Sequence, residues 1–456
     1  MKTESLCPFC LRRIPAKFVI EDDGNVYMEK KCPSHGFFKT IVWRGALELW
    51  KNWIELNDWE PEYYEETVNR TLGDKGCPFD CGLCPEHLRN SCLVVLEVTN
   101  RCNLKCRVCF ASANEKYVYE PDLITIEGMY RTILKYECKF SIPSVQLSGG
   151  EPTIRDDLPE IIAMGKKLGI PHIIVNTNGL RIAKEAEYAK SLKESGLDTI
   201  YLQFDAVDDG IYMKIRGSKL LSHKIKAVEN CANEGIGVVL VPTINSLNLH
   251  QIKDVIQLAQ NWTPTIHGIM FQPMSYFGRY PITPTNDDRI TIPDLLYEIE
   301  KHMEGKLSIN NFVPIGFGRG CETRCGFASM VLIDKNKMMP VTTFPDKDAT
   351  RKIIEGRKGY RGAKHVRELI QEYWRPQPNS EPQACLCNSV HHLEPHCLSI
   401  SAMLFQDVWN IDIKRLKKCC VHVVTPSNLL VPFCAFNVSS IHGNTLYRHQ
   451  ELGKIT

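Results

Sequence analysis

Three cysteines at close spacing dominate one short stretch of the chain. Cys102, Cys106 and Cys109 follow a C-x3-C-x2-C pattern, directly after the apolar run 93–98. Cysteine thiolates are the usual protein ligands of iron–sulfur clusters. A cubane cluster has four irons, so three local thiolates leave one iron without a protein ligand. That iron is able to hold a small molecule, and the pattern therefore predicts a catalytic cluster.

A glycine-rich turn follows the next predicted strand. The apolar run 145–147 leads into Gly149, Gly150 and Glu151. Two glycines let the backbone turn sharply and approach a ligand closely. Three cysteines alone are also compatible with a zinc site completed by a distant ligand. The Gly-Gly-Glu turn after a strand argues against zinc.

Together, the cysteine triplet and the turn resemble the radical S-adenosylmethionine (SAM) superfamily. The resemblance implies that the free iron chelates SAM, and that reductive cleavage of SAM yields a 5′-deoxyadenosyl radical. In that superfamily the turn holds the SAM amino group, so Glu151 is the expected partner. An aromatic residue often precedes the third cysteine, but Val108 stands there in this chain. Phe110 is therefore expected to cover the adenine instead.

The composition limits the remaining possibilities. The chain has 456 residues, a formal net charge of +2 and 43% hydrophobic residues. At about 150 residues per domain, this length allows two to four domains. The balanced charge predicts no nucleic-acid partner. With no signal peptide and no apolar run near the ~20 residues of a membrane span, we expect a cytoplasmic protein, at most peripheral to the membrane.

Twenty cysteines without an export signal indicate metal ligation rather than disulfides. Near the N-terminus, Cys7, Cys10 and Cys32 are expected to supply three ligands of a small metal ribbon built on a hairpin. The fourth ligand is either His35 or a cysteine from elsewhere. A tetrahedral, thiolate-rich site of this kind suits one zinc or one iron ion.

A second C-x3-C-x2-C pattern precedes the catalytic one. Cys77, Cys81 and Cys84 form it, and Cys92 is the expected fourth ligand. Four thiolates close an auxiliary [4Fe-4S] cluster or hold one tetrahedral metal. The position just upstream of the triplet favours electron relay.

A further auxiliary cluster is predicted from cysteines near the C-terminus. Its expected ligands are Cys321, Cys325, Cys419 and Cys434. The alternatives are Cys420 in place of Cys419, or closure of the set by Cys385, Cys387 and Cys397.

Between residues 93 and 280, apolar runs alternate with helical patterns. The runs are 93–98, 145–147, 172–175, 199–204, 237–241 and 267–271. Near-continuous apolar strands separated by helices predict an α/β fold with a parallel sheet. The resemblance implies that this sheet is a partial (β/α)6 radical SAM barrel. Ligands of such sheets lie at the C-terminal ends of the strands.

Polar residues stand at these strand ends, and the resemblance assigns them to SAM. They are Asn176, Asn178, Gln203, Asp205, Thr243 and Gln272. Arg279 follows the last strand and is expected to bind a phosphate or carboxylate of the substrate at the rim. A surface ion pair is the alternative role for this arginine.

Further motifs narrow the resemblance. They are the cysteine patterns at 7–10, 32–36 and 76–84, the stretch 97–106, Gln272-Pro273 with Gly278-Arg279, Phe405-Gln406-Asp407, and Pro432-Phe433-Cys434-Ala435-Phe436-Asn437. Over nearly the whole chain these motifs resemble the archaeal tetraether lipid synthases. The same family has also been described as radical SAM methylases acting on a pterin during methanopterin synthesis.

The resemblance implies that the enzyme joins the methyl ends of phytanyl chains of archaeal lipids into tetraethers or macrocycles. A chain terminus has no acidic proton, so radical chemistry is needed there. The implied cofactors are the radical SAM [4Fe-4S] cluster, SAM, one or two auxiliary [4Fe-4S] clusters, and one mononuclear iron or zinc. The implied partners are a lipid reached at the membrane surface and a reductant such as ferredoxin or flavodoxin.

Two other functions stay open at this point. The first is methylation of a small heterocycle such as a pterin, and the second is a redox or metal carrier. The open iron of the triplet argues against the carrier. We expect four segments: a metal ribbon (1–40), an auxiliary cysteine segment with a helical linker (41–92), the barrel (93–305) and a cysteine-rich C-terminal auxiliary-cluster domain (306–456).

Overall fold

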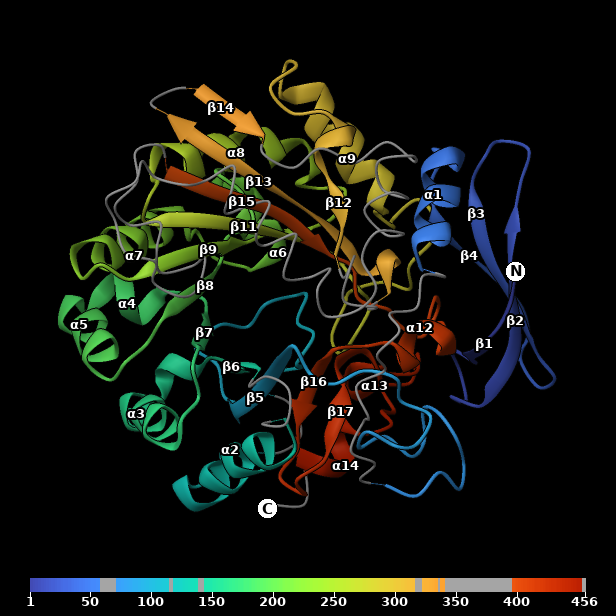
Figure 1. Ribbon diagram of the computed structural model, residues 1–456, viewed down its shortest axis with the longest axis horizontal. Coiled ribbons are helices and arrows are strands. Elements are labelled where there is room, and N and C mark those ends of the chain that lie inside the picture. The colour runs from blue at the N-terminus through green and yellow to red at the C-terminus, as the bar shows by residue number, and fades with distance from the viewer. Residues whose placement is uncertain are drawn as a thin grey trace, which may run out of the picture.

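The computed structural model describes residues 1–57, 71–114, 118–137, 143–315, 322–334, 337–340 and 396–452 (Figure 1). Strands in this part of the chain form two sheets, a small one near the N-terminus and a large mixed one.

The small sheet is an antiparallel ribbon in the order β1-β2-β3-β4, at the right of Figure 1. Its strands are β1 (Lys2–Leu6), β2 (Arg13–Ile20), β3 (Val26–Cys32) and β4 (Gly36–Trp43). Buried and more exposed side chains alternate along β2 and β3, as in a sheet with one covered face. Helix α1 (Leu47–Asn57) follows and packs Trp50 and Trp53 against Trp43.

The apolar runs between residues 93 and 280 are the parallel strands of the barrel, which confirms the predicted fold class. These strands are β5 (Leu93–Thr99), β6 (Ser144–Gly149), β7 (Ile173–Thr177), β8 (Thr199–Gln203), β9 (Gly237–Val241) and β11 (Ile266–Pro273). Each pairs in parallel with the next one along the chain. A short strand, β10 (Thr243–Ile244), pairs with the end of β11. All the C-terminal strand ends therefore meet at one rim.

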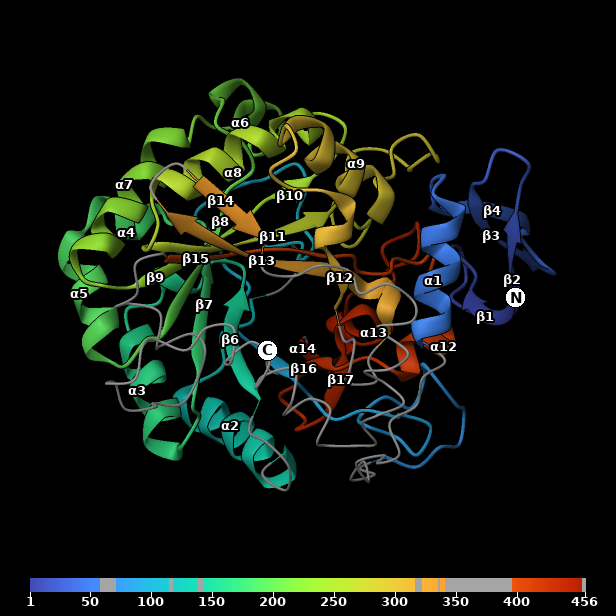
Figure 2. The same cartoon turned by 45° about the horizontal axis from the view of Figure 1, so that its top comes forward.

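Helices cover the outer side of this curved sheet (Figure 2). They are α2 (Leu123–Glu137), α3 (Leu158–Leu168), α4 (Leu180–Lys184), α5 (Ala186–Glu194), α6 (Asp209–Ile215), α7 (Leu221–Asn233), α8 (Ile252–Asn261) and α9 (Ile292–His302). Helix α8 shows why they dock. Its residues Ile252, Val255, Ile256 and Ala259 repeat at helical spacing and are all buried. Within the described ranges, no helix is long and apolar enough to cross a membrane.

The C-terminal segment extends the barrel sheet at both edges. Its elements are β12 (Val313–Pro314), β13 (Gly326–Asp334), β14 (Lys337–Pro340), β15 (His396–Met403), α12 (Ile413–Lys417), β16 (Val421–Val424), β17 (Leu430–Pro432), α13 (Phe433–Asn437) and α14 (Arg448–Leu452). Strand β15 pairs in parallel with β11, and β16 pairs in parallel with β5. The resulting sheet is mixed and open, in the order β12-β13-β15-β11-β9-β8-β7-β6-β5-β16-β17.

A second core joins the three parts of the molecule. It contains Leu6 of the ribbon, Val95 of β5, and Val408, Val423 and Phe436 of the C-terminal segment. The packing is therefore continuous across residue 305, where the sequence predicts the boundary between the barrel and the C-terminal domain.

Candidate active site

The cysteine loop, residues 100–114, follows β5 and packs against the Gly-Gly-Glu turn. The amide of Gly150 donates to the Thr99 carbonyl at 2.7 Å, and the amide of Glu151 donates to the Arg101 carbonyl at 2.8 Å. A Cβ on Gly150 would lie 2.1 Å from the Arg101 carbonyl oxygen, and one on Gly149 would lie 2.0 Å from that of Thr99. The turn needs glycine because its backbone touches the cysteine loop, whereas the sequence analysis ascribed the close approach to a ligand.

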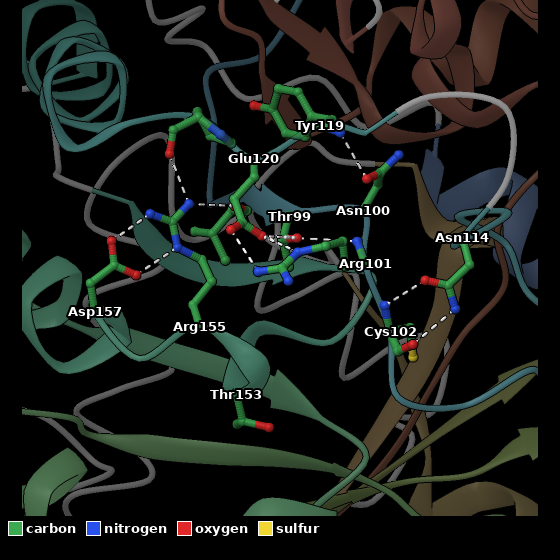
Figure 3. Close-up of polar contacts among 12 residues, drawn as sticks. Thr99, Asn100, Arg101, Cys102, Asn114, Tyr119, Glu120, Thr153, Arg155 and Asp157 are labelled. Atoms are coloured by element: carbon green, nitrogen blue, oxygen red, sulfur yellow. Dashed lines mark hydrogen bonds and ion pairs between the residues drawn. The ribbon is translucent and has the colours of Figure 1, made fainter. Parts of the chain in front are cut away.

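Polar contacts hold the start of the cysteine loop (Figure 3). The side chain of Asn114 bonds both the amide and the carbonyl of Cys102 at 2.9 Å. Arg101 forms an ion pair with Glu120 at 2.6 Å, and Thr99 donates to the same carboxylate. Burial, together with the nearby charges of Glu151 and the other two thiols of the triplet, raises the pKa of the Cys102 thiol to about 12.

Arg279 supports the middle of the loop. Its Nε donates to the Cys106 carbonyl at 2.9 Å, and its backbone exchanges two hydrogen bonds of 2.9 Å with Cys109. The neighbouring Gly278 has φ +55°, and a Cβ there would lie 2.5 Å from the Phe110 carbonyl oxygen. The structure thus gives Arg279 a supporting role at the cysteine loop, and its contact with substrate stays a prediction.

Arg216 is a site residue that the sequence analysis missed. It follows α6, and its guanidinium contacts Asp205 at 2.6 and 3.0 Å, the Val108 carbonyl at 3.3 Å, and the thiol of Cys106. Asp205 is fully buried, and the Thr243 amide also donates to it. The structure gives Asp205 a positioning role, and its direct contact with SAM stays a prediction. A lone arginine at the end of a short helix carried no sequence signal for its contacts.

A buried lysine extends this network toward the neighbouring strands. Lys224 of α7 donates to the Asn178 carbonyl at 2.5 Å and to Gln203 Oε1 at 2.8 Å. Gln203 in turn donates to Asp205. Burial lowers the pKa of Lys224 to about 7. Gln203 thus lies at the strand end where the sequence predicts it. Its side-chain amide already accepts a hydrogen bond from Lys224 and donates one to Asp205.

Glu151 is almost fully buried and joins the turn to β7. Its carboxylate accepts hydrogen bonds from the Thr153 hydroxyl at 2.6 Å, the Thr177 hydroxyl at 2.6 Å and the backbone amide of Asn178 at 2.7 Å. The side chain of Asn178 bonds Asn103 of the cysteine loop at 2.7 Å. The structure therefore gives Glu151 a supporting role, and its contact with SAM stays a prediction.

The other predicted SAM contacts lie at the same rim. Asn176 is half-buried near the end of β7, and Gln272 is half-buried near the end of β11. Thr243 pairs in register with Gln272, and its hydroxyl accepts from Arg216 at 3.2 Å. Phe110 faces Phe433 of α13, with ring centroids 6.0 Å apart. The fold thus brings these residues to the cysteine loop, while their contact with SAM stays a prediction.

The N-terminal ribbon holds a preformed metal site. The ligand atoms of Cys7, Cys10, Cys32 and His35 all lie within 4.8 Å of one another. His35 is therefore the fourth ligand, which decides between the two alternatives left open by the sequence. The set is tetrahedral in type and fits zinc or a single iron ion.

The second cysteine pattern forms a buried group, but without its predicted fourth member. Cys77, Cys81 and Cys84 are buried. The Cys77 thiol and burial raise the pKa of Cys81, and burial with the charge of Cys77 raises the pKa of Cys84. Cys92 instead lies with its Sγ 3.0 Å from that of Cys420. The reason is the register of β5 and β16, which pairs the residues directly after these two cysteines. The assignment of Cys92 to this set is therefore corrected.

The third set is brought together in part. The charges of Cys434, Cys325 and Cys92 act on the Cys419 thiol, so Cys419 lies beside this group, while Cys420 lies beside Cys92. The choice between Cys419 and Cys420 stays a prediction. Cys397 lies at the start of β15, whereas the residue after Cys325 pairs with the end of that strand, which excludes Cys397. Cys321, Cys385 and Cys387 lie outside the described residues.

Comparison with known proteins defines the class. Residues 96–259 match the Radical SAM superfamily, and residues 1–44 match the HMPTM N-terminal zinc ribbon domain. The fold and the site together therefore define a radical SAM enzyme, and this superfamily binds a [4Fe-4S] cluster and SAM. The thiols of the cysteine loop fit this cluster, because all three are free and partly exposed, and the charges of Cys106 and Cys109 act on the Cys102 thiol.

Similar whole proteins define the family. The chain is 36% identical to the 7,8-dihydro-6-hydroxymethylpterin dimethyltransferase of Methanocaldococcus jannaschii, over 96% of this chain and 93% of that protein. It belongs to the family of that enzyme. The Fe-coproporphyrin III synthase of Methanosarcina barkeri is also 36% identical, over 41% of this chain and 45% of its own.

Solved structures are more distant. SuiB of Streptococcus suis, bound to its precursor peptide SuiA, gives a TM-score of 0.40 at 14% identity, covering 66% of this chain and 69% of its own. A structural similarity this remote supports no conclusion about the function of this chain.

The family match overturns the main functional expectation from the sequence. The relative that matches along almost the whole chain is a pterin dimethyltransferase and not a tetraether lipid synthase. The expectation that the enzyme couples lipid chains is wrong on this finding. The same finding supports the alternative of pterin methylation.

Proposed function

We propose that this protein is a radical SAM C-methyltransferase that acts on a pterin. The observation that carries the proposal is 36% identity over 96% of the chain to a 7,8-dihydro-6-hydroxymethylpterin dimethyltransferase. The match extends through the N-terminal ribbon and the C-terminal segment, and so includes more than the barrel that many superfamily members share.

The chain's own residues organise the rim at which this chemistry takes place. When bound, the cluster and SAM supply a radical that removes hydrogen from an unactivated carbon. Asn114, Arg279 and Arg216 fix the cysteine loop from three sides. Asp205 holds Arg216 in place. This support fixes the backbone of the loop that carries the three thiols.

An aromatic group beside the cysteine loop supports a flat substrate. Phe433 lies 6.0 Å from Phe110, 6.4 Å from Phe277 and 4.4 Å from Phe405, measured between ring centroids. Aromatic faces favour stacked and edge-on contacts with other planar rings. Since Phe110 directly follows Cys109, a heterocycle stacked here would lie next to the source of the radical. We propose ferredoxin or flavodoxin as the electron donor.

The test is a reaction of the anaerobically reconstituted, reduced protein with SAM and 7,8-dihydro-6-hydroxymethylpterin. Mass spectrometry should find a pterin heavier by one or two methyl groups, together with 5′-deoxyadenosine. The Cys106→Ala variant serves as the control and should form neither. Release of 5′-deoxyadenosine by the wild type with an unchanged pterin would contradict the proposed substrate.

A further inference from the structure

A partly buried arginine faces the third cysteine set. Arg415 of α12 donates from Nε to the Sγ of Cys325 at 3.2 Å, and from Nη2 to the Leu404 carbonyl. The amide of Gln406 donates to the Sγ of Cys434 at 3.3 Å. Two ligand sulfurs of the predicted cluster therefore already accept hydrogen bonds from the protein.

The charge of Arg415 interacts more strongly with these sulfurs than with the carboxylate of Glu322. Glu322 and Asp412 are both bound by Arg324, at 2.5 and 2.9 Å. The charge of Arg415 interacts first with Cys325 and then with Cys434. Among the described residues, no carboxylate forms an ion pair with Arg415.

A cluster held by thiolates is negatively charged and gains a further negative charge on reduction. Hydrogen bonds to its sulfurs and a buried cation favour the reduced form, and both are recognised controls of cluster potential. A charge near 3 Å acts strongly at a site that water does not screen.

We propose that Arg415 is a positioning residue that raises the reduction potential of a [4Fe-4S] cluster at Cys325, Cys419 and Cys434. This inference depends on the auxiliary cluster and does not depend on the pterin substrate. The site borders the radical centre, because the ring of Phe433, which precedes Cys434, packs against that of Phe110. Its potential therefore bears directly on electron flow at the rim.

The test is a redox titration followed by electron paramagnetic resonance, without substrate. It uses protein in which Cys102, Cys106 and Cys109 are all alanine, so that only auxiliary clusters give signals. The signal lost in an added Cys325→Ala variant identifies the third set. In Arg415→Met, the midpoint potential of that signal should become more negative, and Arg415→Lys should recover part of the shift.

The matched control is Arg155→Met, which removes a buried arginine whose contacts are Asp157 and two backbone carbonyls. It should leave the signal's midpoint potential unchanged. If Arg415→Met loses the cluster, Arg415→Gln replaces it, since it removes the charge but keeps a donor. A midpoint in the surviving variant that equals the parent value overturns the inference, as does an unchanged iron content in Cys325→Ala.

Discussion

The ion pair between Asp205 and Arg216 holds the cysteine loop through a single guanidinium. Asp205→Asn should leave Arg216 without its charged partner, and residues that orient ligand loops commonly change activity by about 10–100-fold. We therefore expect SAM cleavage to slow by about that factor, measured as 5′-deoxyadenosine release.

The matched control for this change is Asp198→Asn. Asp198 pairs with Lys166 next to the N-terminal end of β8, the strand end opposite Asp205. Its loss should leave SAM cleavage unchanged. Equal slowing in both variants would show that Asp205 contributes only to general stability.

The pKa of Lys224 gives a second prediction for a single residue. Burial lowers this pKa to about 7, whereas the unfolded chain keeps a value of about 10.4. Between these values the unfolded state binds the additional proton, so the free energy of unfolding should rise with pH. Relative to Lys224→Met, the wild type should gain a few kcal/mol between about pH 7 and 10 in urea unfolding. A constant difference across this range would show that the folded lysine is not perturbed.

For single residues, the sequence identified the side chains that could carry the chemistry but not the residues that they contact. Cys102, Cys106 and Cys109 lie within one loop, so their spacing alone indicates a shared metal. The partners of Arg279 and Asp205 come from residues far along the chain, and no local pattern encodes them. The sequence therefore placed both residues at the correct rim but could not predict their contacts within the protein.

Among the elements, the Gly-Gly-Glu turn has the least room for change. A methyl on Gly150 would meet the Arg101 carbonyl, which is backbone and cannot swing aside. Gly150→Ala should therefore destabilise the fold by about 3 kcal/mol and reduce the iron content after reconstitution. Gly128→Ala in α2 is the control, because a Cβ there meets no atom closer than 4.0 Å. Normal iron loading in Gly150→Ala would refute the proposed close contact.

The strands show which features of the sheet the apolar pattern predicts and which it does not. Apolar runs between turn residues predicted each parallel strand of the barrel, because a strand buried on both faces is apolar throughout. The same patterns do not say which strand is the neighbour. The spacing predicts that Cys92 completes the ligand set of Cys77, Cys81 and Cys84. The pairing of β5 with β16 instead places Cys92 beside Cys420.

Across the whole molecule, the C-terminal helix is tied to the barrel through one buried ion pair. Arg448 of α14 contacts Glu97 of β5 at 2.5 and 2.9 Å, and both side chains are almost fully buried. Arg448→Met leaves a buried carboxylate without a partner, which typically costs about 3–5 kcal/mol. The urea midpoint should fall accordingly.

A double variant separates this pair from general packing. Glu97→Gln combined with Arg448→Met removes both charges and should recover much of the lost stability. Additive losses in the two single variants and the double variant would mean that the two residues do not interact energetically.

The central claim is that Cys102, Cys106 and Cys109 hold the cluster that cleaves SAM. The most direct measurement is 5′-deoxyadenosine release by reduced, anaerobically reconstituted protein, with the Cys106→Ala variant measured alongside. We expect 5′-deoxyadenosine release by the wild type and none by the variant, while the metal at Cys7, Cys10, Cys32 and His35 is retained in both. Release by the variant at the wild-type rate would contradict the role of Cys106 as a ligand of the SAM-cleaving cluster.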